Sequence, residues 1–309
     1  MQLSIISTLY QSTATIDEFI KRVTASAEQV TQDYELVLVN DSSPDDSLQK
    51  ALVAQQLDSR ILIIDLSRNF GHHEAGMTGI EKAQGDFVFL IDSDLEEAPE
   101  LLLEFWQKMQ QSQSTDVIYG IQERRKGNWF EQLSGSFFYK IFNSLSDIKI
   151  SPNTLTIRLM KRQYVDAITQ YQERNLFVAG IMAHAGFNQQ TMVVAKKSKQ
   201  TTSYTLAKRL KLFFVCITSF SSKLFEYIFT LGGFIVLFSL LTTAYFLLHY
   251  FLFDVNISTI KVILLATGIM TGSLFTCTGL LGFYIASIST EVRQRPRAII
   301  KNIYSKKTD

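Results

Sequence analysis

The stretch RILIIDLSRNFGHHEAGMTGIEKAQGDFVFLIDSDLEEAPE, residues 60–100, decides the fold. It begins with the β-rich run RILIIDL (60–66), continues with a helical pattern over 73–84, and ends with a second apolar run, DFVFLID (86–92). A strand, a helix and a second strand in succession predict a βαβ unit, in which the two strands are parallel. The second strand runs directly into the acidic sequence DSDLEE (92–97).

The same alternation extends over the first 121 residues. The further elements, in chain order, are LSIIST (3–8), a helix over 15–30, ELVLVN (35–40), a helix over 45–57, a helix over 99–112 and DVIYGI (116–121). Such a series predicts an α/β domain with a mostly parallel sheet flanked by helices. Ligands of these sheets bind outside the carboxyl ends of the strands. The acidic loops NDSSPDD (40–46) and DSDLEE (92–97) lie at such ends, so we expect the site there.

Charge and cysteine content exclude several classes of protein. Lys+Arg 30 against Asp+Glu 29 gives a formal net charge of +1, which argues against a nucleic-acid-binding protein. The two cysteines, Cys216 and Cys277, form no spacing typical of a zinc site or a disulfide framework. The amino terminus lacks the pattern of a cleaved signal peptide, and we expect residues 1–200 to stay in the cytosol.

Two long apolar runs occupy the last third of the chain. Residues 227–253 and 262–290 contain no Asp, Glu, Lys or Arg. Each exceeds the roughly 20 residues that a membrane-spanning helix needs, and only DVNISTIK (254–261) joins them, which predicts a transmembrane hairpin. Lys and Arg crowd both flanks, whereas the connecting loop carries only Lys261. The positive-inside rule therefore places both termini, including the basic tail 291–309, in the cytoplasm.

The segment 203–225 alternates a basic face with Leu, Phe and Val at helical spacing. This pattern predicts an interfacial helix lying on anionic lipid, and the alternative is an amphipathic helix packed on the globular domain. We therefore divide the chain into a globular domain (1–200), an amphipathic region (201–226), two transmembrane helices (227–290) and a cytoplasmic tail (291–309).

The acidic triplet DSD offers a metal site. Asp92 and Asp94, two residues apart past a strand end, can present oxygens to one hard divalent cation that keeps positions open for a substrate's phosphates. Bound Mg²⁺ or Mn²⁺ would stabilise the charge on a departing diphosphate, whereas the alternative is a solvated acidic loop. A further acid, Asp41, ends another strand and supports the metal site. His72 and His73 point about 100° apart on a helix, so we expect helix-start or pocket-wall residues rather than a metal pair.

Several segments together resemble the family 2 glycosyltransferases of the GT-A fold, especially the polyprenyl-phosphate branch that includes dolichyl-phosphate mannose synthase. The matching segments are ELVLVNDSSPDDS, the block 66–100, GNWFEQLSGSFFYKIFN and TIRLM. The resemblance covers residues 3–225, and the paired spans have counterparts in bacterial members. It implies a metal-dependent, inverting transfer of a sugar from a nucleotide-sugar donor to polyprenyl (undecaprenyl) phosphate, and we expect the donor to be a UDP-sugar.

The resemblance also implies roles for individual residues. Nucleotide-binding roles fall to Thr8, Tyr10, Asp41 and Asp92, with Thr8 standing where the family usually has proline. Asp92 and Asp94 would hold Mg²⁺ or Mn²⁺, and Asp94 would act in catalysis through that metal. Glu97 is open between a catalytic role and that of a helix N-terminal acid, which the macrodipole favours.

The acceptor end of the site departs from the family. Thr156 replaces the aspartate that is proposed as the base in relatives. A phosphate acceptor has a second pKa of about 6 and needs no base, whereas a hydroxyl acceptor would need one, with Glu97 as the first candidate. Guanidinium groups match phosphate oxygens in pairs, so we expect Arg125 and Arg158 to bind the acceptor phosphate.

Three functions therefore stay open on the sequence. The first is transfer to a polyprenyl phosphate at the inner (plasma) membrane, for cell-surface glycan synthesis. The second passes the sugar to a hydroxyl of a lipid-linked saccharide, and the third is an inactive nucleotide-sugar-binding membrane scaffold. The expected partners are the donor, the lipid acceptor, membrane lipids and a second copy of the chain, since Gly268 and Gly272 would permit close helix contact.

Overall fold

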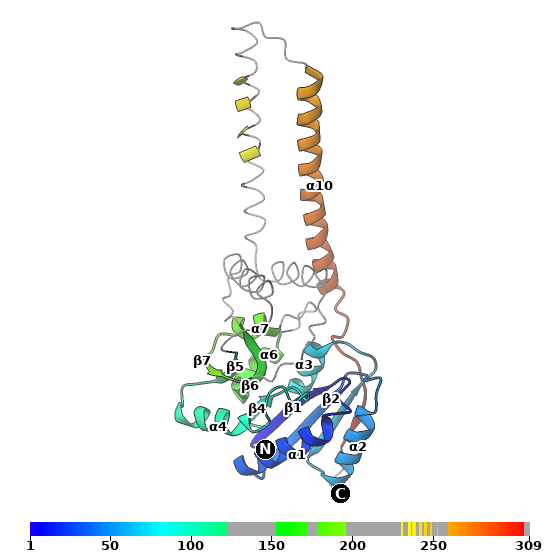
Figure 1. Ribbon diagram of the computed structural model, residues 1–309, viewed down its shortest axis with the longest axis vertical. Coiled ribbons are helices and arrows are strands. Elements are labelled where there is room, and N and C mark those ends of the chain that lie inside the picture. The colour runs from blue at the N-terminus through cyan, green and yellow to red at the C-terminus, as the bar shows by residue number, and fades with distance from the viewer. Residues whose placement is uncertain are drawn as a thin grey trace. The chain divides into compact units, whose positions relative to one another are not determined.

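The computed structural model describes residues 1–122, 153–171, 178–195 and 259–305, with isolated positions between 230 and 252. The chain divides into two compact units. One consists of residues 1–140, 148–206 and 295–309, and the other of residues 141–147 and 207–294. The first unit holds all the described strands, and the second holds the long helix α10 (Thr259–Val292), which is drawn in orange in Figure 1.

The described part of the first unit is built on an eight-stranded sheet in the order β7-β5-β6-β4-β1-β2-β3-β8. The strands are β1 (Leu3–Leu9), β2 (Tyr34–Asn40), β3 (Ile61–Leu66), β4 (Phe87–Leu90), β5 (Val117–Ile121), β6 (Thr154–Lys161), β7 (Gln189–Val193) and β8 (Ile300–Tyr304). β6 and β8 run antiparallel to their neighbours, and the other pairs are parallel. The prediction of a mostly parallel α/β sheet is therefore confirmed.

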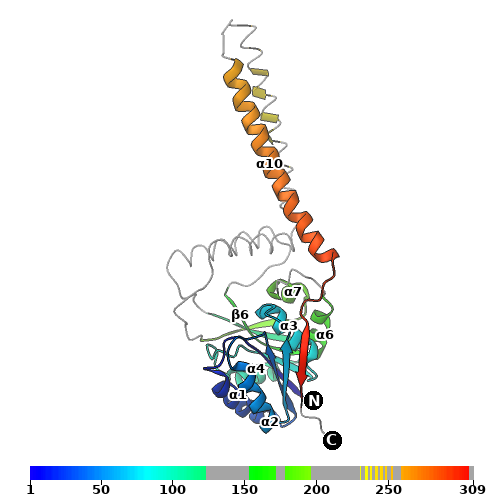
Figure 2. The same ribbon diagram turned by 90° about the vertical axis from the view of Figure 1, so that its right-hand side faces the viewer.

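Helices cover both faces of this sheet (Figures 1 and 2). Those of the first unit are α1 (Ile16–Val30), α2 (Ser47–Leu57), α3 (His72–Lys82), α4 (Leu101–Gln111), α6 (Arg162–Thr169) and α7 (Val178–His184). α1 packs against α2 and α4, whereas α3 packs against β1, β2 and α6. Between α1, α4 and the sheet, Phe19, Phe89 and Phe105 are fully buried, and the rings of the last two meet edge to face with centroids 5.7 Å apart. The helices expected within the first 112 residues are confirmed.

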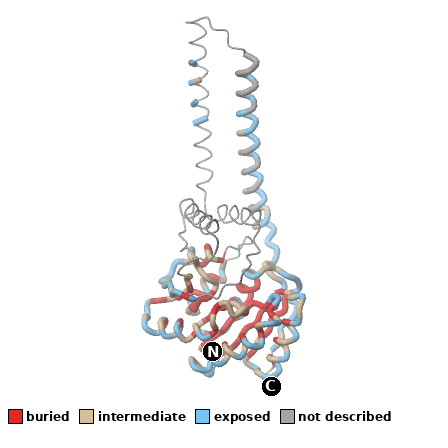
Figure 3. Tube along the Cα trace, viewed as in Figure 1, coloured by how far each residue is buried: buried red, intermediate tan, exposed pale blue. Residues whose placement is uncertain are grey.

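Every residue of β1 and β2 is buried (Figure 3). These two strands lie inside the sheet with helices on both faces, which explains why their sequences read as continuous runs rather than as an alternation. β1 pairs with β2 on one side and with β4 on the other. The chain therefore leaves β1 toward β2 and β3 and later returns to its opposite side. This change of direction makes the carboxyl ends of β1 and β4 a topological switch point, where ligands of such sheets bind.

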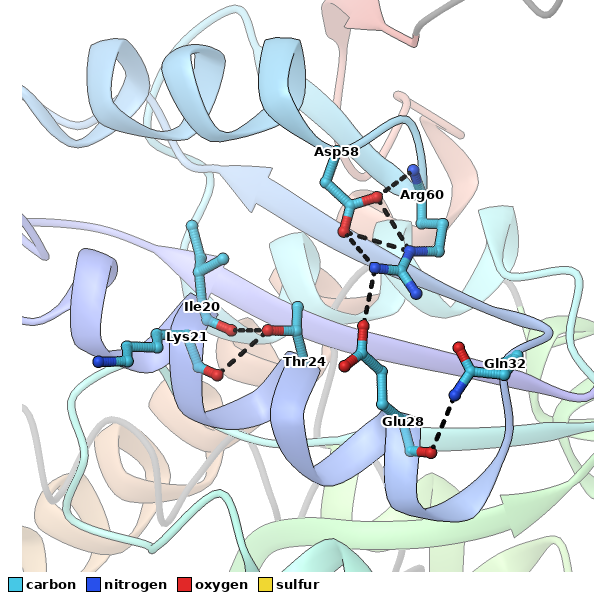
Figure 4. Close-up of polar contacts among 7 residues, drawn as sticks. All are labelled: Ile20, Lys21, Thr24, Glu28, Gln32, Asp58 and Arg60. Carbon is cyan, nitrogen blue, oxygen red and sulfur yellow. Dashed lines mark hydrogen bonds and ion pairs between the residues drawn. The ribbon is translucent and has the colours of Figure 1, made fainter.

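A small ionic cluster lies at the amino end of β3 (Figure 4). Arg60 donates hydrogen bonds to Asp58, and its Nη2 lies 3.0 Å from the Glu28 carboxylate on α1. The guanidinium also stacks 4.4 Å above the ring of Tyr34. Ion pairs that are this exposed contribute on the order of 0.2–1 kcal/mol each, so the cluster orders the turn before β3 and adds little to the stability of the core.

The predicted basic tail contains a strand that the sequence pattern did not indicate. β8 pairs antiparallel with β3, with Asn302 opposite Asp65, and appears as the red strand in Figure 2. The Ser67 amide donates to the Ile299 carbonyl oxygen at 2.9 Å, which extends this pairing. Asp65 is buried and accepts a 2.7 Å hydrogen bond from the side-chain amide of Asn40. The buried carboxylate of β3 therefore has a hydrogen-bond partner next to the added strand. The end of the chain thus returns to the first unit after α10.

The C-terminal hairpin is not confirmed. α10 encloses the second of the two apolar runs. Among the described residues, none of the helices combines the length and the apolar character that a membrane crossing requires. The amphipathic region 201–226 and most of 227–253 lie outside the described residues. The interfacial helix and the two spans therefore stay predictions.

Gly79 provides a test of the close packing of α3 on the sheet. A Cβ atom at this position would overlap Ile6 Cγ2 and would lie 3.0 Å from Val39 Cγ2, both of which belong to central strands. We expect Gly79→Ala to lower the free energy of unfolding by about 1–3 kcal/mol, because overpacking forces buried strands to shift. A urea titration of the full-length protein measures this change.

Gly76 on the same helix is the matched control, since its added Cβ would lie 4.0 Å from Thr8 Cγ2, an ordinary contact. Gly76→Ala should leave stability unchanged or raise it by up to ~1 kcal/mol, because alanine is the better helix former. Equal losses in both variants would contradict the packing argument.

Candidate functional site

Four residues tie the end of β1 to the end of β4. Thr8 Oγ1, near the end of β1, lies 2.9 Å from Nδ1 of His72, the first residue of α3. Nε2 of the same ring lies 3.4 Å from Asp92 Oδ1. The Ser93 hydroxyl donates a 2.8 Å hydrogen bond back to the Thr8 carbonyl oxygen. These contacts of Thr8, His72, Asp92 and Ser93 form a closed ring of polar groups at the switch point, which we call the polar ring.

The DSD triplet lies on a sharp turn after β4. The Asp92 side chain is 21% exposed, and Asp94 is half-buried, with its Oδ1 accepting the Glu96 amide at 3.0 Å. Leu95 has a φ of 60°, a left-handed conformation that a bulky residue rarely adopts. The turn therefore bends the chain immediately after Asp94 and leaves both aspartates beyond the carboxyl end of β4.

These two aspartates are suited to a hard cation that shares its ligands with a substrate. Mg²⁺ usually binds through one or two carboxylates and completes its shell with water and substrate phosphates. Within the described residues, no group of three or more His, Cys, Asp or Glu side chains is arranged to hold a metal by itself. Asp92 and Asp94 fit such an ion when water or phosphate oxygens supply the remaining ligands.

Asp41 is buried and is engaged by the backbone of the domain. Its Oδ1 accepts the Phe70 amide at 2.7 Å, and its Oδ2 accepts the Gly71 amide at 3.0 Å. Gly71 has a φ of 111°, which favours glycine, and it directly precedes α3. Asp41 therefore holds the turn that places His72. Its predicted contact with the nucleotide stays a prediction.

A second hydrogen-bonded acid, the half-buried Asp45, joins the loops after β1 and β2. It accepts hydrogen bonds from the Ser43 and Ser47 hydroxyls at 2.5 and 2.6 Å and from the Thr13 amide at 3.1 Å. Burial by itself would raise the pKa of Asp45, but these hydrogen bonds from Ser43, Ser47 and Thr13 together lower it well below its usual range.

Tyr10, in the loop after β1, is 48% exposed and so is accessible to a ligand.

A cavity of about 100 Å³ opens beside the polar ring. It is lined by His72, His73, Gly76, Met77, Ile80, Leu90, Thr154, Leu155, Thr156, Arg158, Val178 and Ala179. Most of these side chains are apolar, and the polar ones come from the start of α3 and from β6. The cavity therefore combines an apolar wall with a cationic group, the guanidinium of Arg158.

Arg158 is buried and is oriented by the protein. Its Nε donates to the Thr156 carbonyl oxygen at 2.9 Å, its Nη2 to the Leu155 carbonyl oxygen at 3.1 Å, and its Nη1 contacts the Met182 sulfur. Burial lowers the pKa of Arg158, and the electrostatic influence of Tyr164, Tyr119 and Asp92 acts in the opposite direction. Because a guanidinium has five N–H groups, these contacts still leave donors for a ligand.

His73 lines the cavity, and its side chain is exposed. Desolvation by the neighbouring protein, together with the electrostatic influence of His72 and Arg158, lowers the pKa of His73 to about 4. The ring is therefore neutral at pH 7 and can offer one donor and one acceptor without adding charge.

The structure brings together some of the residues that the sequence indicated. Thr8 and Asp92 meet through His72, and Arg158 lines the cavity next to them with Thr156. Glu97 is fully buried, so its role as a base stays a prediction. Arg125 lies outside the described residues. The bridging role of His72 was missed, since it depends on a contact between residues 64 positions apart.

Asp41 offers a test that separates a structural role from nucleotide binding. In Asp41→Asn, the side-chain NH₂ would face one of the two backbone N–H donors, and that buried donor would lose its acceptor. We expect the free energy of unfolding to fall by about 1–3 kcal/mol, measured by urea titration of the full-length protein.

The control is Asp46→Asn, because Asp46 is exposed and makes no side-chain hydrogen bond to the first turn of α2. This variant should unfold like the wild type. If Asp41→Asn instead retained full stability and lost only donor affinity, Asp41 would be a ligand-binding group rather than a clamp on the turn.

The chain resembles known proteins along almost its whole length. The sequence profile of glycosyl transferase family 2 matches residues 4–169. A Mycobacterium tuberculosis protein named as a glycosyltransferase is 40% identical over 98% of this chain and 89% of its own length. The Bacillus subtilis glycosyltransferase YkcC is 32% identical over 98% of this chain and 94% of its own. The undecaprenyl-phosphate 4-deoxy-4-formamido-L-arabinose transferase of Proteus mirabilis is 26% identical over 98% of this chain and 94% of its own. The family resemblance is therefore confirmed: the chain belongs to glycosyl transferase family 2 and is a glycosyltransferase.

Proposed function

We propose that this glycosyltransferase moves a sugar from a UDP-sugar to a polyprenyl phosphate such as undecaprenyl phosphate. The observation that carries the proposal is the cavity beside Asp92, which pairs an apolar wall with the buried guanidinium of Arg158. A lipid phosphate offers an anion attached to a hydrocarbon chain, and such a cavity suits both parts. Relatives named as undecaprenyl-phosphate transferases support the same class of acceptor.

The donor side of the site would be formed at the switch point. Thr8 lies near the end of β1, and Tyr10 and Asp41 lie on the loops after β1 and β2, where the nucleotide would bind. Asp92 and Asp94 would hold Mg²⁺ or Mn²⁺. When bound, that cation supplies positive charge to the departing diphosphate. The polar ring keeps the loop after β1 and the DSD turn in register, so the nucleotide and its diphosphate would meet a preorganised surface.

The acceptor side requires little proton transfer. A phosphate monoester has a second pKa of about 6, so its oxygen is mostly ionised at pH 7. That oxygen would form the new bond to the anomeric carbon while the bond to the diphosphate oxygen breaks and UDP leaves, which inverts the configuration. Arg158 would hold the phosphate. Thr156, at the place of the family's aspartate, is compatible with an acceptor that arrives already ionised.

An acceptor hydroxyl on a lipid-linked saccharide is the second candidate. It would need a general base, and the residue at the family's position for that base is Thr156, which lines the cavity. The product distinguishes the two reactions, because a sugar linked to a lipid phosphate is labile to mild acid and a glycosidic bond to a saccharide hydroxyl is not. An inactive scaffold would bind a nucleotide sugar without forming either product.

We also propose that the C-terminal part anchors the enzyme in the inner (plasma) membrane with the catalytic domain on the cytoplasmic side. Support comes from the uncharged runs 227–253 and 262–290 and from the basic residues that flank them. α10 adds large exposed apolar side chains, namely those of Ile263, Ile269, Met270, Leu274, Phe275, Leu281, Ile285 and Ile288. An apolar surface of this kind suits contact with lipid.

Extraction of membranes tests the anchor. After expression of the full-length chain, an alkaline carbonate wash should leave the protein in the membrane pellet, because a hairpin in the hydrocarbon core is held by hydrophobic burial rather than by charge. Release into the supernatant, like that of a peripheral protein, would contradict the proposed spans.

Asp94 tests the transfer reaction. We expect Asp94→Asn to lower transfer by about 100-fold or more, because a charge that faces the departing diphosphate through its cation is lost. The amide oxygen can still accept the Glu96 backbone N–H, so the turn should persist. The assay uses full-length protein, Mn²⁺, undecaprenyl phosphate and a panel of labelled UDP-sugars, and it follows a lipid product that is labile to mild acid.

Glu100→Gln is the matched control, since Glu100 is exposed and pairs with Arg22 at 2.7 Å. This variant should transfer at the wild-type rate. An acid-stable product would favour the saccharide hydroxyl, and donor binding without any product would favour the scaffold.

A further inference from the structure

His72 stands between two parts of the proposed donor site and is engaged on both ring nitrogens. We propose that His72 is a positioning residue that orients the Asp92 carboxylate for a divalent cation and is itself oriented by the Thr8 hydroxyl. The inference rests on the proposed function in one respect only, namely that Asp92 holds a cation. It assigns a role in metal binding to a residue other than Asp92 and Asp94.

The chemistry of the ring selects one arrangement of protons. A neutral imidazole has one N–H donor and one acceptor nitrogen. With the proton on Nδ1, the lone pair of Nε2 would face the Asp92 oxygen 3.4 Å away, and the two negative partial charges would repel. With the proton on Nε2, the ring donates toward Asp92, and Nδ1 accepts the hydrogen of the Thr8 hydroxyl at 2.9 Å. The carboxylate therefore favours the second tautomer, which links Thr8, His72 and Asp92 in one direction.

The support around the ring is rigid on both sides. His72 opens α3 directly after the turn that Asp41 grips through the Phe70 and Gly71 amides. Thr8 lies on a fully buried strand, and its carbonyl oxygen accepts the Ser93 hydroxyl. The imidazole is thus fixed by elements of the core, although its side chain is 43% exposed. Such support is what an outer-shell hydrogen bond needs in order to orient a metal ligand.

The consequence concerns metal affinity. An aspartate that rotates freely must be ordered when a cation binds, whereas a carboxylate already held by His72 requires less ordering. Loss of an outer-shell partner typically weakens metal binding by about 10–100-fold. The competing roles are a direct His72–metal bond and a purely structural role at the start of α3.

Titration of the full-length protein with Mn²⁺, followed by the electron paramagnetic resonance signal of the free ion, tests the inference without a transfer assay. We expect His72→Ala to weaken Mn²⁺ binding by about 10–100-fold. Thr8→Val removes the hydroxyl but keeps the shape, and it should cause a smaller loss in the same direction. The double variant should bind like His72→Ala alone, because both changes break the same chain of contacts.

Two further variants keep the test decisive. His72→Gln retains an N–H donor and should bind Mn²⁺ with an affinity between those of the wild type and His72→Ala, so it replaces the alanine variant if that one unfolds. His184→Ala is the control for the loss of a histidine, since His184 is exposed and contacts Tyr171 instead. It should bind Mn²⁺ like the wild type, and thermal unfolding of each variant reports its folding.

The outcomes separate this inference from the proposed function. Mn²⁺ affinity that is unchanged in His72→Ala would overturn the positioning role, as would a wild type that binds no Mn²⁺. A large loss in His72→Ala with no effect of Thr8→Val would indicate a direct ligand and would overturn it as well. A wild type that binds Mn²⁺ with the expected coupling but forms no glycosyl phosphate would refute the proposed function and leave the role of His72 standing.

Discussion

The pairing of β1 with β4, and the polar ring across their ends, is the constraint on which the site depends. Parallel pairing places Ile6 opposite Leu90, so the residues that follow both strands emerge side by side. Backbone pairing alone would leave the loops free to diverge. Ser93 and His72 prevent this by bonding the backbone and the side chain of Thr8, so that the DSD turn and the loop after β1 form one surface.

The acidic loops of this domain serve two purposes that look alike in the sequence. Asp41 is buried and Asp45 is half-buried, and both accept hydrogen bonds from amides and hydroxyls of neighbouring loops, which compensates the cost of removing a carboxylate from water. Asp92 and Asp94 stay partly exposed at the edge of the sheet. The first pair shapes the turns, and the second pair remains accessible to a ligand. The groups that each carboxylate contacts, rather than the residue type, distinguish the two roles.

The return of the chain to the sheet adds a constraint of another kind. β8 pairs with β3, which would otherwise be an edge strand. Arg297, just before β8, forms an ion pair with Glu81 on α3. The first unit of this glycosyltransferase is therefore assembled from segments on both sides of α10 in the sequence. An edge strand exposes unpaired backbone groups, and pairing with β8 satisfies those of β3 on that side. Folding of the sheet thus depends in part on residues near the end of the chain.

Much of the fold could be predicted because its signals are local. The alternation of apolar runs and helical patterns up to Ile121 indicated the first five strands and the four helices among them, and Asp92 and Asp94 were located by their place after a strand. β6 and β8 were harder to predict, because an antiparallel strand at these positions depends on partners such as Phe89 or Ile64 that are distant in sequence. Local patterns carry no information on such pairing.

By itself, the sequence determined the α/β class, the family and the edge of the sheet at which the acids gather, since strand and helix periodicity and short motifs are properties of neighbouring residues. Only the tertiary structure decided that Asp41 faces inward, that Arg158 lines a cavity and that His72 joins Thr8 to Asp92. These roles depend on distances and burial, which arise when segments far apart in the chain pack against one another.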